Sequence, residues 1–423
     1  MTLLLKNARF LDWEKLSFTD THILVEEGVN GKLFFTPKSV PDIEVSEVLD
    51  CQGKIVTKSF AVGHHHIYSA LATGMPAPAK NPENFYEILK YIWWTLDKAL
   101  DKEMIEASAL ATAVACAKAG STFVIDHHAS PNAIDGSLET IANAFEKVGV
   151  GHLLCYEVTD RDGREKAEQG LHETEHYLKK HQGLVGLHAS FTVGDETMKK
   201  AVDLVEKFRS GLHIHVAEDR YDQDQALVQY GRRVLERLND YGMLDQSKTL
   251  LVHGLHLSNH ERKLFRESKA FMAENMESNL NNGVGVFNGN GLGSRIMLGT
   301  DGMHSDMIRS AQQAYFAGQS FETIGFEETY HRFRNVHRYL KENRFEGDGE
   351  NNLVVLDYRG RTPVTEDNIL GHFIFGWDAS RVQHVISDGR LILKDSIMQT
   401  VDEAEVMTFA QEQAQRLWSR MKG

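Results

Sequence analysis

The sequence predicts an α/β protein built on a (β/α)8 barrel, a TIM-like fold, with a small β domain made from both ends of the chain. Two observations support this prediction. Eight short apolar runs alternate with helix-like segments through the middle of the 423 residues, and most of these runs end on histidine or another metal-ligand side chain. A parallel barrel opens its active site at the C-terminal ends of its strands, so such side chains would meet at one mouth.

The first part of the chain reads as short strands separated by glycine turns. Candidate strands lie at 3–5, 22–25, 32–35 and 46–50. The eight barrel runs follow at 55–62, 122–125, 153–158, 184–187, 212–216, 249–252, 270–273 and 296–298. Helical patterns separate most of them, at 103–119, 138–148, 165–181, 196–209, 225–238 and 259–268.

The last third of the chain predicts a return to the first sheet. Segment 276–293 holds five Gly and five Asn and predicts a loop over the barrel mouth. Helical segments reach about residue 342, and strand-like runs return at 352–356, 382–386 and 390–393 before a final helix at 403–421. We therefore expect a composite β domain of residues 1–55 with 352–423, and a catalytic barrel of residues 56–351.

Composition excludes several functional classes. The net charge is −14 and the pI is about 5.8, which disfavours nucleic acid and anionic membranes as partners. The three cysteines are too few and too scattered for a disulfide framework, and Cys155 reads as a core residue. No segment predicts a signal peptide or a membrane span, so we expect a cytoplasmic protein.

The first histidine cluster follows the first barrel run, where residues 64–66 are all histidine. Residues i and i+2 of an extended strand end point the same way, so His64 and His66 can share one metal ion while His65 faces away. Neutral imidazole is the commonest ligand of catalytic first-row metals. Taken alone, this pattern also fits surface histidines, but the later clusters favour a metal site.

The fifth strand ends in a second pattern of this kind. His213 and His215 share a face, and we expect only one of them to reach a metal. Glu218 follows where the strand gives way to loop, in position to contact a water activated by the metal. A glutamate with a raised pKa suits proton transfer at neutral pH. The alternative is a solvated Glu218 paired with Arg220.

Two more strand ends add ionisable groups. His253 ends the sixth strand, and Asp301 ends the eighth between small glycines. An isolated buried carboxylate is costly, so a metal ligand or a base is the natural role of Asp301. The ends of the third and fourth strands lack the lysine that commonly bridges two metals in barrel hydrolases, which favours one metal ion over two.

The order HxH, HxHxxE, a single histidine and then Thr-Asp-Gly resembles the amidohydrolase superfamily. Within it, the chain is similar to the branch of cytosine, guanine and methylthioadenosine deaminases and chlorohydrolases. Segments 64–75, 126–131, 154–163 and 298–303 most resemble SsnA-type aminohydrolases. The resemblance runs from about residue 50 to the C-terminus. It is specific for the superfamily and much less so for a substrate.

The resemblance implies one divalent metal ion, Zn²⁺ in preference to Fe²⁺. Its ligands would be His64, His66, His215 and Asp301. Asp301 and His253 would help remove a proton from the attacking water. Glu218 would shuttle a proton to the ring nitrogen of the substrate and help ammonia leave.

The resemblance also implies a set of substrate contacts. His188 matches a position that contacts substrate in related deaminases, and His127 and His128 match a pair seen in some members that act on purine- or triazine-like rings. Tyr68 could wall the pocket, as could Trp93 and Trp94, although aromatic residues in a helical segment are more often core. Two departures stand out: residues 57–63 replace the usual Pro-Gly, and residues 272–276 replace a His-Asn-Pro-like sequence.

The implied reaction is hydrolytic deamination of an amino-substituted purine-, pterin- or pyrimidine-like heterocycle. Three alternatives stay open. The same site could remove chloride or an alkylamine from a triazine-like ring. An amide-ring hydrolase of the dihydropyrimidinase kind is disfavoured by the missing lysine. A non-catalytic metal-containing binding protein is disfavoured by the complete ligand set with Glu218. The expected partner is a small heterocyclic substrate; the oligomeric state stays open, with a homodimer among the alternatives.

Overall fold

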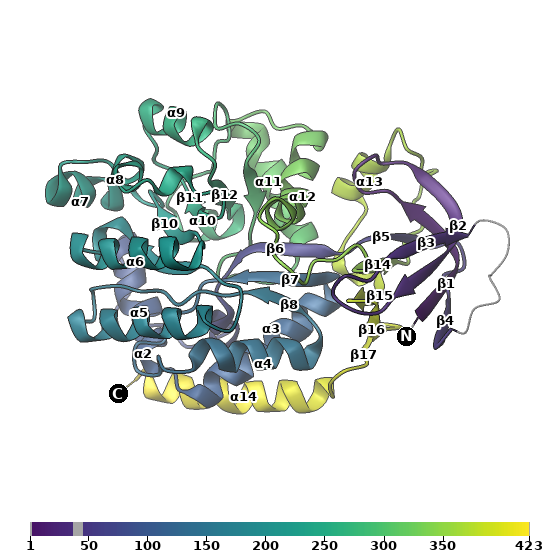
Figure 1. Ribbon diagram of the computed structural model, residues 1–423, viewed down its shortest axis with the longest axis horizontal. Helices are drawn as coiled ribbons and strands as arrows, with labels where there is room; N and C mark the ends of the chain where they lie inside the picture. Colours follow the sequence, from purple (N-terminus) through teal and green to yellow (C-terminus); the bar gives the residue numbers. More distant parts are fainter. Residues whose placement is uncertain (1, 37–44, 423) are drawn as a thin grey trace.

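The computed structural model describes residues 2–36 and 45–422 and contains the predicted barrel (Figure 1). Its eight strands are β6 (Phe60–His65), β7 (Ser121–Asp126), β8 (Gly151–Leu153), β9 (Val185–Ala189), β10 (Leu212–Val216), β11 (Leu250–His253), β12 (Phe271–Glu274) and β13 (Ile296–Leu298). Strands β6–β8 and β9–β13 form two parallel sheets. Backbone bridges from Leu154 to Gly183 and from His65 to Asp301 join the two sheets into a closed ring.

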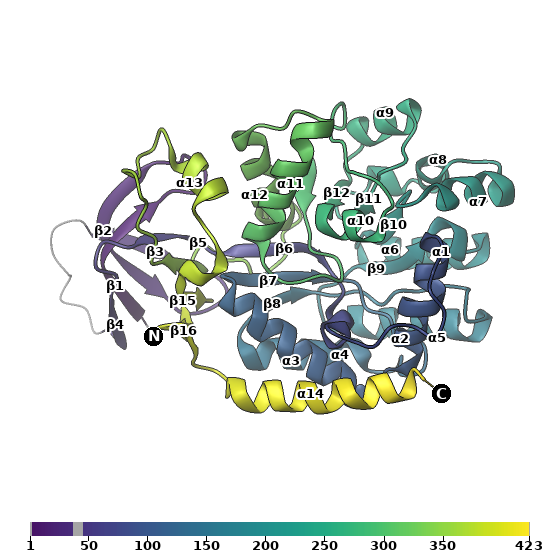
Figure 2. The ribbon, with the colours of Figure 1, turned by 180° about the vertical axis from the view of Figure 1, so that it is seen from behind.

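Helices surround the ring and alternate with its strands (Figures 1 and 2). They are α3 (Lys102–Lys118), α4 (Ser137–Val148), α5 (Arg164–Leu178), α6 (Asp195–Phe208), α7 (Arg220–Tyr230), α8 (Val234–Asp240), α9 (Asn259–Glu267), α11 (Met307–Phe321) and α12 (Phe326–Glu342). Some of them begin at a side chain that caps the helix, as in α3, α7, α9 and α11. Asp101 accepts a hydrogen bond from the Met104 amide, and Ser258 forms a capping box with Glu261.

Two segments at the barrel mouth depart from a regular barrel. Between β6 and α3 the chain forms short helical pieces: η1 (Ile67–Ala72), α1 (Phe85–Ile88), the π-helical η2 (Leu89–Trp93) and α2 (Trp94–Ala99). Segment 276–293 is only partly the predicted loop, because it begins with α10 (Met276–Asn282). That helix ends at Gly283, whose φ of 65° is left-handed, so the glycines mark the end of a helix.

A further sheet, outside the barrel, is built from both ends of the chain, and we call it the composite sheet. Its strands are β1 (Thr2–Leu11), β2 (Phe18–Glu26), β3 (Leu33–Thr36), β4 (Glu47–Asp50), β5 (Ile55–Lys58), β14 (Leu353–Leu356), β15 (Val382–Ser387), β16 (Arg390–Lys394) and β17 (Ile397–Met398). The two ends meet where β5 pairs antiparallel with β14. A short helix, α13 (Ile369–Phe375), lies between β14 and β15.

The predicted first barrel strand, 55–62, is therefore two strands in two sheets. The chain changes sheet at Ser59, whose amide donates to Asn352 O. The Arg334 guanidinium donates to the carbonyls of Lys58 and Ser59 at 3.1 and 2.8 Å and holds this corner. We still propose the division into residues 1–55 with 352–423 and residues 56–351, although β5 belongs to the composite sheet.

The last helix, α14 (Glu403–Arg420), leaves the composite sheet and runs along α3 on the outside of the barrel (Figures 1 and 2). The Trp418 indole donates to Leu71 O at 2.8 Å. Within residues 2–36 and 45–422, no helix combines the length and hydrophobicity that crossing a bilayer requires.

A buried ion cluster lies beside the start of β6, at the N-terminal ends of the barrel strands and therefore opposite the mouth. Lys58 Nζ is 2.6 Å from Asp348 Oδ1 and donates to Gly349 O at 2.7 Å, while His337 Nδ1 is 2.7 Å from Asp348 Oδ2. All three side chains are buried. We call Lys58, His337 and Asp348 the basal cluster. Both carboxylate oxygens of Asp348 have a partner there.

Candidate metal centre and substrate pocket

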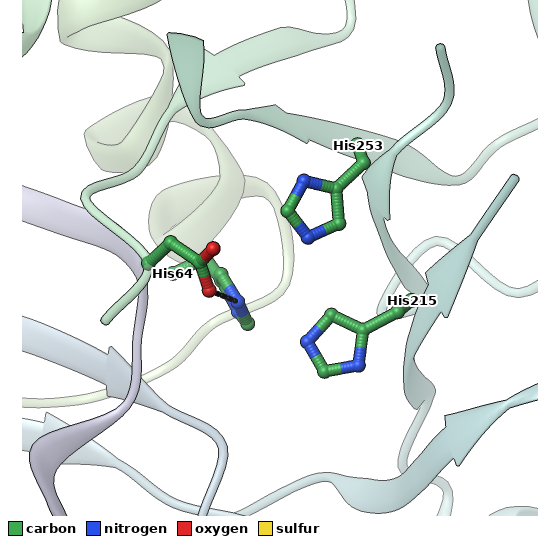
Figure 3. Close-up of side chains that lie close together, drawn as sticks. His64, His215 and His253 are labelled. Atoms are coloured by element: carbon green, nitrogen blue, oxygen red, sulfur yellow. Dashed lines mark ion pairs between the residues drawn. The ribbon is translucent and has the colours of Figure 1, made fainter. Parts of the chain in front are cut away.

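The predicted metal ligands converge at the C-terminal mouth of the barrel. His66 Nε2 lies 3.1 Å from Asp301 Oδ1 and 3.1 Å from His215 Nε2, and His64 Nε2 lies 3.3 Å from the same Asp301 oxygen. His64, His215, His253 and Asp301 bring one ligand atom each within 4.8 Å of one another. Figure 3 shows the His64, His215 and His253 rings turned toward one another from different strands.

The backbone turns sharply at the strand ends that carry these side chains. Ala217, His253 and Asp301 have φ values of 48°, 74° and 51°, which are uncommon for residues with a side chain. Gly63 permits a close approach between β6 and β13, since a Cβ there would lie 2.5 Å from Leu298 O. Such strain concentrates at functional sites, where it aims side chains inward.

Hydrogen bonds to backbone carbonyls fix two of the imidazoles. His66 Nδ1 lies 2.7 Å from His127 O, and His215 Nδ1 lies 2.8 Å from His188 O. A carbonyl only accepts, so each Nδ1 carries a proton, and in the neutral, metal-binding form of the ring each Nε2 has a lone pair that faces the centre. His64 Nε2 is buried and, among the described residues, has no hydrogen-bond partner. Three nitrogen lone pairs beside one carboxylate fit a divalent metal such as Zn²⁺.

Asp301 is the anionic member of the cluster. Burial alone would raise its pKa, but the neighbouring imidazoles of His64, His66 and His253 outweigh burial and hold that pKa well below its usual range. Ser278, on α10, donates a short hydrogen bond to Asp301 Oδ2. Asp301 is therefore ionised; Ser278 holds its Oδ2, while its Oδ1 faces the imidazoles of His64 and His66.

Glu218 and His253 lie beside the cluster as a pair. His253 Nε2 is 3.4 Å from Glu218 Oε2, and the Glu218 side chain is 13% exposed. Burial and the nearby Asp301 charge raise the pKa of Glu218 well above its ordinary value. Asn279 Nδ2 donates to His253 Nδ1 at 2.8 Å, which leaves the His253 proton on Nε2. His253 thus presents an N–H to the centre, unlike the three lone-pair imidazoles.

An aromatic-lined pocket opens above this centre, with about 890 Å³ of empty volume that includes open solvent. The cluster residues His66, His215, Glu218, His253 and Asp301 line its inner end. The aromatic rings in its wall belong to Tyr68, Phe85, Tyr86, Trp93, Trp94, Phe191 and Tyr221. Several of them come from the short helices between β6 and α3. Tyr68 and His188 line the pocket, as do Trp93 and Trp94.

His127 and His128 lie behind the pocket wall. Both are fully buried, and neither is among the residues that line the pocket. His127 Nε2 is 3.1 Å from Leu187 O and its Nδ1 is 3.2 Å from Glu157 Oε2, while His128 Nε2 is 2.9 Å from Ser130 Oγ. In place of the expected substrate contacts, we propose that these two histidines support the wall.

The pocket also contains an ion network that the sequence reasoning missed. Arg161 Nη1 donates to Glu157 Oε1 at 2.7 Å, and Arg161 Nη2 makes a short ion pair with Asp97. Both acids and the arginine line the pocket and are nearly buried. Glu157 and Arg161 fall within the segment 154–163 that carried the family resemblance. Asp97 lies 64 residues before Arg161, and no local pattern signals that pairing.

The unusual seventh strand end forms a separate buried network. Glu274, in the segment that departs from the family pattern, accepts from Arg332 Nη1 at 2.8 Å, and the same nitrogen is 2.8 Å from Glu322 Oε1. Glu322 in turn accepts from the Gly289 amide. Burial raises the pKa of Glu274 to about 7. This strand end therefore anchors the loop after α10, and Glu274 does not line the pocket.

Comparison with known proteins places the chain in a family. The model of the amidohydrolase family matches residues 60–332, more than half of the chain. A 5'-deoxyadenosine deaminase of Methanococcus vannielii is 25% identical, over 92% of this chain and 95% of the relative. A 5-methylthioadenosine/S-adenosylhomocysteine deaminase of Caldanaerobacter subterraneus is 23% identical, over 99% of both chains.

Solved structures share the fold. The crystal structure of an adenosine deaminase from Xanthomonas campestris with bound zinc superimposes with a TM-score of 0.84 at 17% identity, covering 99% of this chain and 98% of that one. The predicted α/β fold class and the predicted resemblance are confirmed, and so is the prediction of a hydrolase. The chain belongs to the amidohydrolase family.

Proposed function

We propose that the protein is a metal-dependent hydrolase that releases ammonia from an amino-substituted heterocycle, with aminopurines as the first substrate class to test. One observation carries the proposal: the lone-pair imidazoles and Asp301 face Glu218 and His253 at the inner end of an aromatic-lined pocket. The full-length relatives named as deaminases of adenosine-type compounds support it.

The proposed ligands are His64 Nε2, His66 Nε2, His215 Nε2 and one oxygen of Asp301. The orphaned, buried His64 Nε2 is the observation that best fits an ion at this place. A bound Zn²⁺ would lower the pKa of a water toward neutrality and make it a nucleophile. Zinc is preferred to iron because a structural neighbour contains zinc, but the same ligand set accepts both metals.

The protein groups around the water divide the proton transfers. Asp301 is the anionic group that can accept a proton, and the Nε2–H of His253 can donate a hydrogen bond that orients the water. Glu218, whose pKa is raised by burial and by Asp301, can hold a proton at neutral pH. It would deliver that proton to the ring nitrogen next to the carbon under attack, and then assist the departure of ammonia.

The wall of the pocket favours an uncharged substrate. Arg161 is the one lysine or arginine among the described residues that line the pocket, and Glu157 and Asp97 already neutralise it. Asp97 Oδ1 and Trp94 Nε1 are buried and lack hydrogen-bond partners among the described residues. We propose that aromatic rings stack on the heterocycle, that these two atoms meet polar substituents, and that phosphorylated substrates are rejected.

An ammonia-release panel tests the proposal. Adenosine, 5'-deoxyadenosine, guanine, an 8-oxopurine amine, a pterin and cytosine would be supplied to protein whose metal content is measured on the same sample. We expect release from at least one purine and none from AMP. Release of chloride or an alkylamine from a triazine would support the alternative leaving group. Metal-loaded protein that releases nothing from any compound would contradict a catalytic role.

A further inference from the structure

His64 is held differently from the other two imidazoles of the proposed metal site. The Nδ1 atoms of His66 and His215 each face a backbone carbonyl. His64 Nδ1 instead lies 2.8 Å from Nε2 of His213, a side chain on β10. Among the three proposed histidine ligands, His64 is the one whose Nδ1 faces another imidazole. The proposed mechanism assigns no role to that second imidazole, His213.

The contacts continue beyond His213 to a backbone atom. His213 Nδ1 lies 3.4 Å from Cys155 Sγ, and Cys155 Sγ lies 3.4 Å from Asp126 O. His64, His213 and Cys155 are all fully buried. The chain of contacts therefore runs from the centre to the barrel interior within buried side chains.

The last atom determines the direction of every hydrogen bond in this chain. Asp126 O only accepts, so the Cys155 thiol donates to it and Sγ can accept from His213 Nδ1–H. His213 Nε2 then has the lone pair that accepts from His64 Nδ1–H. His64 consequently has no proton on Nε2, the atom that faces Asp301 Oδ1 at 3.3 Å.

We propose that His213 is a positioning residue which, supported by Cys155, fixes the tautomer and the ring orientation of His64 for metal binding. The proposal rests on the metal site proposed above. Partners of this kind typically contribute 10- to 100-fold to metal affinity. What His64 needs from residue 213 is a hydrogen-bond acceptor at the position of Nε2, and a side chain other than imidazole could supply it.

Two substitutions that differ in the acceptor separate this role from packing. His213→Gln places an amide oxygen near the position of Nε2, whereas His213→Met fills similar space without a strong acceptor. Zn²⁺ affinity would be measured by competition with a chelator, and the Co²⁺-substituted protein by its visible absorption. We expect His213→Met to weaken metal binding by roughly 10- to 100-fold and His213→Gln to stay within a few-fold of the parent protein.

A matched pair of controls uses His384, a buried histidine on β15 in the composite sheet. His384→Gln and His384→Met should leave the metal affinity unchanged. If His213→Met does not fold, Cys155→Ala replaces it, with an expected loss of a few-fold in affinity that Cys155→Ser restores. Equal affinities of the Gln and Met variants at 213, or of the Ala and Ser variants at 155, would overturn the proposal.

The readout is independent of turnover, because metal affinity is measured without substrate. A parent protein that binds Zn²⁺ tightly but deaminates nothing would contradict the proposed function and leave the role of His213 intact. A parent protein without tight metal binding would contradict the metal site itself, and with it the role of His213.

Discussion

Two buried polar clusters lie at opposite ends of the barrel, and they are built on opposite rules. In the basal cluster, both oxygens of the Asp348 carboxylate have a cationic or imidazole partner within 2.7 Å. At the mouth, His64 Nε2 has no hydrogen-bond partner among the described residues, and the acid Glu218 lies near a second acid, Asp301.

This difference in hydrogen-bond satisfaction indicates that the basal cluster contributes to stability and the residues at the mouth contribute to function. Removing either partner of a satisfied buried ion pair destabilises the fold, because the remaining charge is left uncompensated. Unsatisfied donors and acceptors are costly to fold, and they are retained where a ligand or a reaction uses them. We therefore expect substitutions at the mouth to reduce turnover with little loss of stability, and basal substitutions to do the reverse.

The largest expected effect is at the mouth. Glu218→Gln removes the proton that the mechanism delivers but keeps the size of the side chain, so turnover should fall by about 10²- to 10⁴-fold. Metal content should be unchanged and the melting temperature equal or higher, because a buried acid near Asp301 is removed. Ammonia release, metal analysis and thermal unfolding on one sample check this.

The matched control is Glu173→Gln, another buried glutamate, which accepts hydrogen bonds from the Gly136 and Leu138 amides away from the pocket. This variant should lose stability and retain turnover per folded molecule. Near-normal turnover of Glu218→Gln would show that Glu218 is not the proton donor.

Asp348→Asn should produce the opposite result. It leaves Lys58 buried beside a neutral amide, and breaking a buried ion pair typically costs about 3–5 kcal/mol of unfolding free energy. The folded fraction should keep its metal affinity and its kcat. Urea unfolding and steady-state kinetics of the same preparation measure both, and a loss of kcat without a loss of stability would contradict the separation of the two clusters.

The sequence could predict the cluster of side chains at the barrel mouth because short, local sequence patterns indicate each of its residues. Each of its residues lies at or just after the end of a recognisable strand, and the closure of a barrel brings strand ends together. These residues are His64, His66, His215, Glu218, His253 and Asp301. The wall of the pocket could not be predicted in this way. The pairing of Asp97 with Arg161 depends on how the helices between β6 and α3 fold over the mouth, and no periodicity encodes that. The Asn-rich segment after β12 obscured α10, which carries Ser278 and Asn279.

Low pH tests the basal cluster without any substitution at the mouth. Burial would raise the pKa of Asp348, but the charges of His337 and Lys58 lower it to about 2, from an ordinary value of 3.8. A depressed carboxyl pKa stabilises the fold above the unfolded-state value, and that contribution disappears as the pH falls from about 4 through 2. The expected size is about 2 kcal/mol.

The measurement compares urea unfolding of the metal-free parent protein and of Asp348→Asn between pH 5 and pH 2.5. Titrating groups remote from Asp348 contribute equally to both proteins, so the difference between their stabilities reports on Asp348 together with its partners Lys58 and His337. That difference should narrow as the pH falls. A difference that stays constant over this range would show that the carboxylate of Asp348 is not the source of the stabilisation.

The smallest effect expected at the mouth concerns Asn279, which donates to His253 Nδ1. Asn279→Ala removes that donor, so His253 can also take the tautomer with its proton on Nδ1, and the Nε2–H that orients the water is lost part of the time. We expect kcat to fall about 10-fold, with KM and metal content unchanged, because the residue acts through His253 and touches neither metal nor substrate. Steady-state kinetics with metal analysis check this. A changed KM with an unchanged kcat would assign Asn279 to the substrate wall, and lost metal would mean that His253 is a ligand after all.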